Sequence, residues 1–299
     1  MERYRNGKIS IQKFELTSKV YSSEILHLIY KWLDIALQND VKDLVIGGSG
    51  LKLPIFKILA AKSLRELVLN DCSLEFFSFT KCSSLRKLSL TKINLDENIL
   101  QTLLNSCPLL VTFILERCSG LKKIELLNHQ NIKLVSIKTK GKPKHLVKIQ
   151  IQTLEHFSYY DLRKEELDVV ECQNLKSLNI SYVKISNGFL RDFISRSQSL
   201  KVLKIQNCDG VLCQNQGVQS YLDALLWICQ SRKLKLKIQL KCEMCSCFID
   251  RLMCMKLKVV KVYKYDGKNQ GLHPIEFERE NLSIFAFRGW ETFLFLLDW

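Results

Sequence analysis

Apolar residues recur along the chain at a fixed set of spacings, with charged residues between them. Counted from a leading Leu at position 0, apolar side chains stand at positions 3 and 5, and a Cys or apolar residue follows near position 8. The clearest copies begin at Leu64, Leu85 and Leu110. Positions 3 and 5 face the same side of a short strand because strand side chains alternate with period two. The pattern therefore predicts one half-buried strand in each copy.

The copies return with a period that is typical of leucine-rich repeats. Further copies begin at Ile132, Leu154, Leu175 and Leu200, and successive copies from residue 64 onward are 21 to 25 residues apart. One strand cannot bury its apolar face alone, so consecutive repeats must stack. We therefore expect an α/β leucine-rich-repeat solenoid of about ten main repeats. A curved parallel sheet would line its concave face, with helices and irregular turns on its convex face.

The first repeat, residues 8–40, is long enough to carry a helix. Residues 8–17 fit the strand pattern, and residues 41–46 fit it again. Between them the apolar residues form one helical stripe, which predicts a helix over about 23–38. Residues 47–50 read Gly-Gly-Ser-Gly but lack the following Lys-Ser/Thr of a phosphate-binding loop. A flexible turn is expected there.

Other elements of the return path follow from caps and from weaker copies of the pattern. Asp96 is a suitable N-cap for a helix that Cys107 and the proline after it would end. Weaker copies at Leu121 and Leu146 lie between main repeats, so we place them on the outer, returning side. Two further helices are expected over residues 187–194 and 218–229.

The C-terminal third is less regular. Residues 233–241 alternate Lys and apolar side chains, which predicts a strand in one of two registers: Leu236 and Ile238, or Ile238 and Leu240, occupy positions 3 and 5. A last strand of the repeat type is expected over residues 257–262.

These patterns divide the chain into residues 1–265, the solenoid, and residues 266–299. The second part begins with a polar segment containing Gly and Pro, residues 266–281, which is expected to be a loop. It ends in an apolar and aromatic tail, residues 282–299. That tail is either a cap over the last coil or an incomplete extra domain.

Composition narrows the class of protein. Hydrophobic residues make up 47% of the 299, enough for a continuous core. There is no 18-residue apolar run, and the first 20 residues are charged and polar, so we expect neither a membrane span nor a secretory signal. Among twelve cysteines, Cys72, Cys118 and Cys208 fall at position 8, where a free Cys acts as a compact apolar group. This usage indicates a reducing compartment, the cytoplasm or the nucleus.

Three stretches resemble the plant F-box/leucine-rich-repeat proteins: IQKFEL with IYKWLDIALQNDVKDLVI, SLRELVLNDCSL, and LLNSCPLLVTFILERCSGLKKIEL. The resemblance implies a non-enzymatic adaptor of a cullin–RING ubiquitin ligase, in which an F-box docks on a Skp-type adaptor and the repeats present a protein substrate. Residues 1–8 hold nothing like an F-box, so the chain is expected to be the substrate-facing region. A Skp-type adaptor is expected as a partner only if an F-box is missing from this sequence. A repeat-only protein-binding scaffold is the alternative.

The candidate partner-binding surface is the concave face, to which positions 2, 4 and 6 of each strand point. Early repeats place a mixed set of charges there, whereas from Ile132 onward these positions carry no acidic residue. With a formal net charge of +15, this distribution favours an acidic protein segment as the bound partner. Solvated lysines on an open sheet are the alternative interpretation. The candidate residues are Lys87, Lys138, His156, Tyr160, Lys204, Lys237, Lys241, Lys261 and Tyr263, with Lys237 and Lys241 depending on the register of their strand.

Nucleic acid is the second alternative partner. Residues 122–148 contain eight lysines against one Glu, and several of these lysines fall in the segment 138–145. Phosphate contacts need such charge, but that segment has no aromatic residue for stacking and no arginine for reading bases. A solvated loop is therefore favoured over a nucleic-acid site.

Neither a cofactor nor a metal is expected. Cys242, Cys245 and Cys247, with Cys254 nearby, form a single CxxC with an irregular continuation, which is weaker than the paired arrangement of a structural zinc site. No HExxH, GxSxG or phosphate-loop motif is present, and the five histidines are scattered. The sequence therefore offers no catalytic constellation.

Overall fold

The computed structural model describes most of the first two thirds of the chain and the strands of the last third. The described residues are 9–20, 23–75, 81–139, 146–161, 167–169, 172–183, 193, 196–206, 208, 235–241, 259–266, 271–275 and 292–298. The chain forms two compact units, Met1–Leu154 (unit 1) and Glu155–Trp299 (unit 2). Each unit is described by itself.

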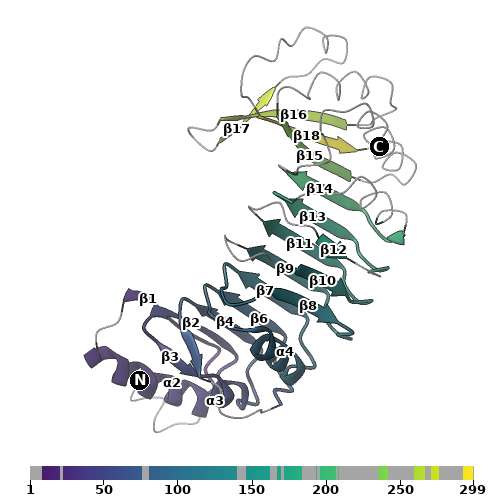
Figure 1. The fold of residues 1–299 in the computed structure, drawn as a ribbon. Coiled ribbons are helices and arrows are strands. Elements are labelled where there is room, and N and C mark those ends of the chain that lie inside the picture. The colour runs from purple at the N-terminus through teal and green to yellow at the C-terminus, as the bar shows by residue number, and fades with distance from the viewer. Residues whose placement is uncertain are drawn as a thin grey trace. The chain divides into compact units, whose positions relative to one another are not determined.

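Unit 1 is built on a parallel sheet with one strand from each main repeat. Figure 1 shows the strands side by side in chain order. Each strand pairs in parallel with the next, so the predicted leucine-rich-repeat fold is confirmed. The strands are β1 (Lys13–Val20), β2 (Asp43–Ser49), β4 (Glu66–Asn70), β6 (Lys87–Thr91), β7 (Thr112–Glu116) and β9 (Leu134–Thr139).

The core of unit 1 is a row of apolar side chains that the strand register aligns. Leu67 pairs with Leu88, and Leu88 pairs with Phe113, all at position 3 of their repeats. All three side chains have 0% exposure. Position 5 forms a second buried row through Leu69 and Leu90. Successive repeats therefore bury each other's apolar faces, as stacking requires.

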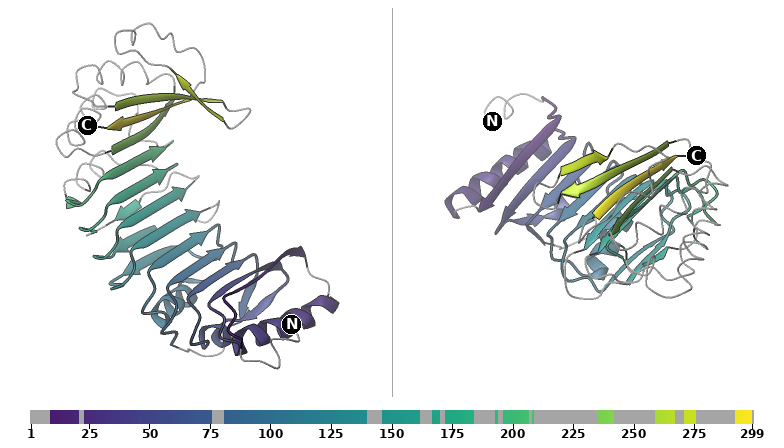
Figure 2. Two further views of the ribbon diagram at one scale, coloured as in Figure 1. Left: turned by 180° about the vertical axis from the view of Figure 1, so that it is seen from behind. Right: turned by 90° about the horizontal axis from the view of Figure 1, so that it is seen from above.

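Helices and two short ladders form the return side of unit 1. The predicted first helix is α2 (Ser23–Gln38), and the hydroxyl of Tyr30 on it donates to the carbonyl of Lys52 at 3.0 Å. The predicted cap is also present, because a carboxylate oxygen of Asp96 accepts the amide hydrogen of Ile99 at 2.8 Å at the start of α4. Figure 2 shows α2 and α4 from two further sides. No helix among the described residues is both long and apolar enough to cross a membrane.

The weaker copies of the repeat pattern lie on this return side, as expected. They form β8 and β10, which pair with each other in parallel. A similar short ladder joins β3 and β5. The elements of the return side after α2 are β3 (Lys52–Pro54), α3 (Ile55–Leu59), β5 (Ser73–Glu75), α4 (Glu97–Ser106), β8 (Lys123–Leu127) and β10 (Leu146–Gln150). A further short strand, β12 (Leu167–Val169), belongs to unit 2.

Three neighbouring strands of unit 1, β4, β6 and β7, end at a corner with a left-handed residue at position 7. Asp71, Lys92 and Arg117 have φ values of 53°, 52° and 53°. This conformation costs an ordinary residue about 1–2 kcal/mol. In return, the amide of each corner residue donates to the position-6 carbonyl of the next repeat, as from Lys92 to Glu116 at 2.8 Å. The hydrogen-bond ladder thus continues past the end of the strand.

Unit 2 begins with the same parallel pattern. Its first strands are β11 (His156–Asp161), β13 (Ser177–Ser181), β14 (Val202–Gln206) and β15 (Lys235–Lys241). On β15, Leu236 and Ile238 pair with Leu203 and Ile205 and are 1% and 0% exposed. The register left open by the sequence is therefore the one with Leu236 and Ile238 at positions 3 and 5.

The sheet of unit 2 then becomes antiparallel, which the sequence pattern did not predict. Strand β18 (Thr292–Asp298) lies between β15 and β16 (Val259–Asp266) and pairs antiparallel with both. The expectation that Val260 and Val262 continue the parallel ladder is therefore wrong. Strand β17 (Gly271–Ile275) pairs with β16 inside the segment expected to be a loop, and its Pro274 stands in an edge strand, where proline is tolerated.

The glycine-rich stretch at the end of β2 also differs from the expected turn. Gly47 belongs to the strand and pairs with Thr17 and Asn70 on its two sides. A Cβ at Gly47 would stand 3.0 Å from the carbonyl oxygen of Asn70, so glycine permits close strand packing there. Strand β2 ends at Ser49, and the chain turns only at Gly50.

Several expected elements fall outside the described residues. These are the helix over 218–229, residues 257 and 258 of the last strand, the tail before residue 292, and the helix over 187–194 except for Phe193. Phe193 is helical and buried.

We expect Phe113→Ala to lower the free energy of unfolding by about 3–5 kcal/mol, because it leaves a cavity in the buried row between Leu88 and Val135. The next residue, Ile114, is only half buried and points to the other side of β7, so Ile114→Ala should cost about 1 kcal/mol. Urea unfolding of both variants measures the difference. Equal losses would contradict the assignment of the two faces.

Gly120→Ala and Gly50→Ala form a second matched pair. Both glycines are left-handed, with φ values of 90° and 89°. A Cβ at Gly120 would stand 2.6 Å from the carbonyl oxygen of Leu95, whereas nothing lies within 4 Å of one at Gly50. Both variants should lose about 1–2 kcal/mol from backbone strain, and Gly120→Ala should lose at least about 1 kcal/mol more. Thermal or urea unfolding tests this, and a larger loss at Gly50 would refute it.

Candidate functional site

The main sheet has one face in the core and one face open. In β4, for example, Leu67 and Leu69 are buried, and Glu66, Val68 and Asn70 alternate with them on the other side. We call the face formed by positions 2, 4 and 6 the open face. It is the face on which the sequence placed the candidate partner-binding residues.

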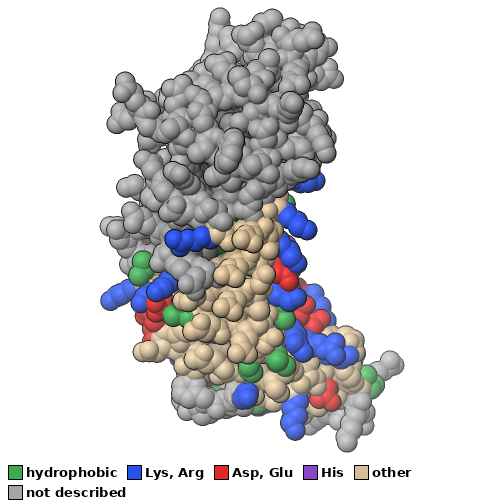
Figure 3. Space-filling model, turned by 90° about the vertical axis from the view of Figure 1, so that its right-hand side faces the viewer, with side chains coloured by type: hydrophobic (Ala, Val, Ile, Leu, Met, Phe, Trp, Pro, Cys, Tyr) green, Lys and Arg blue, Asp and Glu red, His purple; other side chains and the backbone are tan. Residues whose placement is uncertain are grey.

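On unit 1 the open face carries charges of both signs that compensate one another. Glu66 and Lys87 stand opposite each other on neighbouring strands, with 2.8 Å between the carboxylate oxygen and Nζ. Figure 3 shows one side of the molecule, where basic and acidic side chains lie interspersed over the described part. The charged residues of this open face are Lys13, Glu15, Asp43, Glu66, Lys87, Glu116 and Lys138.

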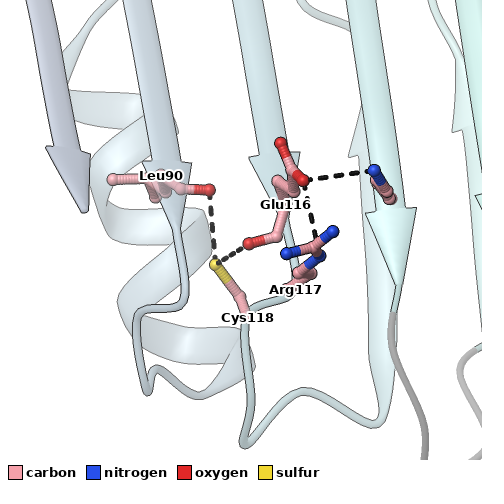
Figure 4. A network of polar contacts seen from close by, with 5 residues as sticks. Leu90, Glu116, Arg117 and Cys118 are labelled. Carbon is pink, nitrogen blue, oxygen red and sulfur yellow. Dashed lines mark hydrogen bonds and ion pairs between the residues drawn. The ribbon is translucent and has the colours of Figure 1, made fainter. Parts of the chain in front are cut away.

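Glu116 is the centre of a small network at the end of β7, shown in Figure 4. Its carboxylate lies 3.5 Å from Nε of Arg117 and 3.3 Å from Nζ of Lys138, which stands opposite it on β9. The thiol of Cys118 donates to the carbonyl oxygens of Leu90 at 3.4 Å and Glu116 at 3.7 Å. The network therefore ties the corner of this repeat to the strand before it and the strand after it.

The cysteine at position 8 has a role that spacing alone did not reveal. In unit 2, Cys208 repeats the geometry of Cys118, with its sulfur 3.6 Å from the carbonyl oxygen of Ile180 and 3.4 Å from that of Gln206. Burial raises the pKa of Cys118 to about 11, so its thiol keeps its proton at neutral pH. The spacing indicated burial correctly, but the hydrogen bonds depend on where the neighbouring repeat places its carbonyl groups.

On unit 2 the open face of the first three strands carries no carboxylate. Lys204 stands in the middle of β14 beside Asn179, whose amide donates to the hydroxyl oxygen of Ser158 at 3.3 Å. The hydroxyl of Ser181 donates to the side-chain oxygen of Gln206 at 3.3 Å. The nine positions are occupied by His156, Ser158, Tyr160, Ser177, Asn179, Ser181, Val202, Lys204 and Gln206.

A tyrosine pair lies at the carboxyl end of these strands. The rings of Tyr160 and Tyr182 are 5.0 Å apart between centroids and tilted by 56°. Tyr182 was not among the predicted site residues, because it stands at position 7, the left-handed corner, with a φ of 59°. Its place beside Tyr160 follows from the stacking of repeats. The only feature of the sequence that could have identified Tyr182 as a site residue is that a tyrosine stands at position 7 of its repeat.

The structure places the predicted residues in three groups. Lys87 and Lys138 lie on the open face of unit 1, and His156, Tyr160 and Lys204 lie on that of unit 2. Of the other four, only the backbone positions are described. Lys237 pairs with Lys204, Lys241 pairs with Thr292, and Lys261 and Tyr263 pair with Leu296 and Leu294 on β18.

The other candidate sites are a metal cluster, a nucleic-acid site and a titrating histidine. They contain no group of three or more His, Cys, Asp or Glu side chains arranged to hold a metal ion. The cluster from Cys242 to Cys254 and the lysine-rich segment 140–145 lie outside the described residues. Burial lowers the pKa of His129, which favours its neutral form.

The repeat region matches a known family. Residues 29–166 match the model described as "FBD-associated F-box protein At5g56370, LRR repeats". The matched region begins within α2 and contains the strands from β2 to β11. The match therefore lies mostly in the part of the chain that carries the main repeats of unit 1.

Two curated relatives from Arabidopsis thaliana have the same type of name. F-box/LRR-repeat protein 25 is 27% identical over 160 residues, which cover 52% of this chain and 61% of the relative. F-box/LRR-repeat protein At3g03360 is 25% identical over 195 residues, which cover 61% of this chain and 39% of the relative. The chain thus spans less than two thirds of each relative. The resemblance to the plant F-box/leucine-rich-repeat proteins is confirmed, and the repeats of this chain are of the type found in that family.

Proposed function

We propose that the chain is a protein-interaction module whose open face binds a protein substrate, as the recognition part of an F-box-type adaptor of a cullin–RING ubiquitin ligase. The names of the matched family and of the two relatives support the link to F-box proteins. The role is presentation: a captured protein is held in a fixed orientation, and the chain itself performs no chemistry.

The open face is suited to binding because its side chains stand on a rigid support. Strands in the interior of each unit's sheet, such as β4, β6 and β7 of unit 1 and β13 and β14 of unit 2, are hydrogen-bonded on both sides, and their buried residues lock them to the neighbouring repeats. Neighbouring strands are about 4.8 Å apart, so the open-face side chains form a regular grid. A partner that matches this grid loses little free energy to ordering the site, since the site is already ordered.

The observation that carries the proposal is the difference in charge between the open faces of the two units. On unit 1, Glu66 and Glu116 neutralise lysines on neighbouring strands. On unit 2, Lys204 has no ion pair among the described residues, and its register neighbours are Asn179 and Lys237. Glu155 and Asp161 flank the open-face positions of β11, but Glu155 is paired with Lys176, and Asp161 is buried and accepts a hydrogen bond from the hydroxyl of Tyr159 at 3.2 Å. We infer that the open face of unit 2 binds an acidic segment of the partner.

Lys204→Glu should weaken binding of an acidic peptide about tenfold, which corresponds to about 1.4 kcal/mol. The matched control is Lys201→Glu, because Lys201 is exposed but precedes β14 and lies off the open face. Fluorescence anisotropy with a labelled poly-glutamate peptide at physiological salt measures both affinities. Equal weakening by the two variants would show that binding depends only on the net charge of the chain. If the unchanged protein does not bind the peptide, the open face of unit 2 is not a site for acidic segments.

A second measurement separates an adaptor from a scaffold without a ligase link. Co-expression of a Skp-type adaptor with the chain extended upstream to any F-box that its gene encodes, followed by co-purification in moderate salt, should yield a stoichiometric complex if the adaptor role is correct. Absence of the complex while poly-glutamate binding persists would favour the repeat-only scaffold. Retention on heparin that outlasts moderate salt, without peptide binding, would favour nucleic acid.

A further inference from the structure

Two cysteines of unit 1 occupy the same place in successive repeats. Cys82 and Cys107 each stand three residues before the leading Leu of their repeat, Leu85 and Leu110. The register of β6 and β7 joins residues 25 apart, as in Lys87 with Thr112, and the two cysteines are separated by the same 25 residues. The stacking of repeats therefore brings them together.

The contacts at this place confirm that the two side chains meet. The amide of Cys82 donates to the carbonyl of Ser106, the residue before Cys107, at 2.7 Å. Both are free thiols, and their side chains are 1% and 2% exposed. A hydrogen bond from Cys107, which outweighs the effect of burial, lowers the pKa of Cys82 to about 6, and the same contact raises the pKa of Cys107. The two thiols are therefore in contact, and this contact favours loss of the proton from Cys82 rather than from Cys107.

We propose that Cys82 and Cys107 are a redox modification site and form a reversible disulfide across two repeats when a hydroperoxide reaches them. Neighbouring strands are about 4.8 Å apart, and disulfides span Cα separations of about 4.4–6.8 Å. The bond therefore forms without separating the repeats. This inference depends on the packing of unit 1 alone and is independent of the proposed binding function.

The reaction balances with hydrogen peroxide as the oxidant. Cys82 gives up its thiol proton, and the resulting thiolate attacks one peroxide oxygen and displaces hydroxide, which takes up the proton that Cys82 released and leaves as water. The sulfur of Cys107 then attacks the sulfenic acid sulfur of Cys82, and the hydroxyl group departs with the thiol proton as a second water. Two thiols are oxidised to one disulfide, and one peroxide is reduced to two waters.

The other described cysteines are not placed to form a disulfide with one another in this way. Cys72 and Cys118 also share a repeat position, but Ile93 occupies that position in the repeat between them. Two repeats separate their backbones by about 10 Å, which is beyond the span of a disulfide. Cys172 and Cys208 belong to unit 2 and stand at different repeat positions.

The disulfide would link the coil that carries β6 to the coil that carries β7. Cys107 also caps the end of α4, so the bond would fix the end of that helix to the turn before β6. The oxidised chain should therefore unfold at a higher denaturant concentration than the reduced chain, because its unfolded state is restricted by the closed loop.

The test uses the full chain, reduced and then exposed to a small excess of hydrogen peroxide under native conditions at pH 7. After the remaining thiols are alkylated, peptide mapping should find the Cys82 and Cys107 peptides joined, with the mass of two hydrogen atoms lost. Dithiothreitol should release them. The linked peptide should be absent from Cys82→Ser and Cys107→Ala and present in Cys72→Ser, the matched control.

Mapping of the unchanged protein requires no variant to fold and decides the outcome by itself. Recovery of Cys82 and Cys107 as alkylated thiols under these conditions, or linkage of either one to another cysteine, would overturn the proposal. A linked pair that does not raise the urea midpoint would overturn the stabilising effect.

Discussion

The structure depends on one constraint: no repeat can bury its own apolar face. Leu88 at position 3 of its repeat has Leu67 on one side and Phe113 on the other, and all three are removed from solvent only because their repeats are stacked in register. A shift of one residue in any strand would turn its leucines to the open face. Strand register, core and binding surface are therefore consequences of the same packing.

The corners of the repeats show how this stacking is maintained where the strands end. Ordinary residues such as Lys92 accept a left-handed conformation because it directs their amides to the next repeat. At the position after the corner, the thiols of Cys118 and Cys208 contact carbonyl groups of two repeats. Polar backbone groups that a strand would leave unpaired at its end are thus satisfied.

The open face is free to vary because it contributes little to this packing. Its positions hold paired charges such as Glu66 with Lys87 in unit 1, and amides, hydroxyls and lysines in unit 2. Exposed ion pairs of this kind add little stability. The proposed function therefore rests on the pattern of charge along the strands and not on the stability that these pairs add.

The sequence by itself determined the repeat positions, one strand in each main repeat of unit 1, the helices α2 and α4 and the Asp96 cap, because each depends on local periodicity or on a local hydrogen bond. It also placed Lys87 and Lys138 on the open face of unit 1, and His156, Tyr160 and Lys204 on that of unit 2, since alternation along a strand is a local rule. Only the tertiary structure decided the register of β15, the insertion of β18 between β15 and β16, and the meetings of Tyr160 with Tyr182 and Cys82 with Cys107. These features join residues that are distant in the chain, and pairing between distant segments is set by packing rather than by local pattern.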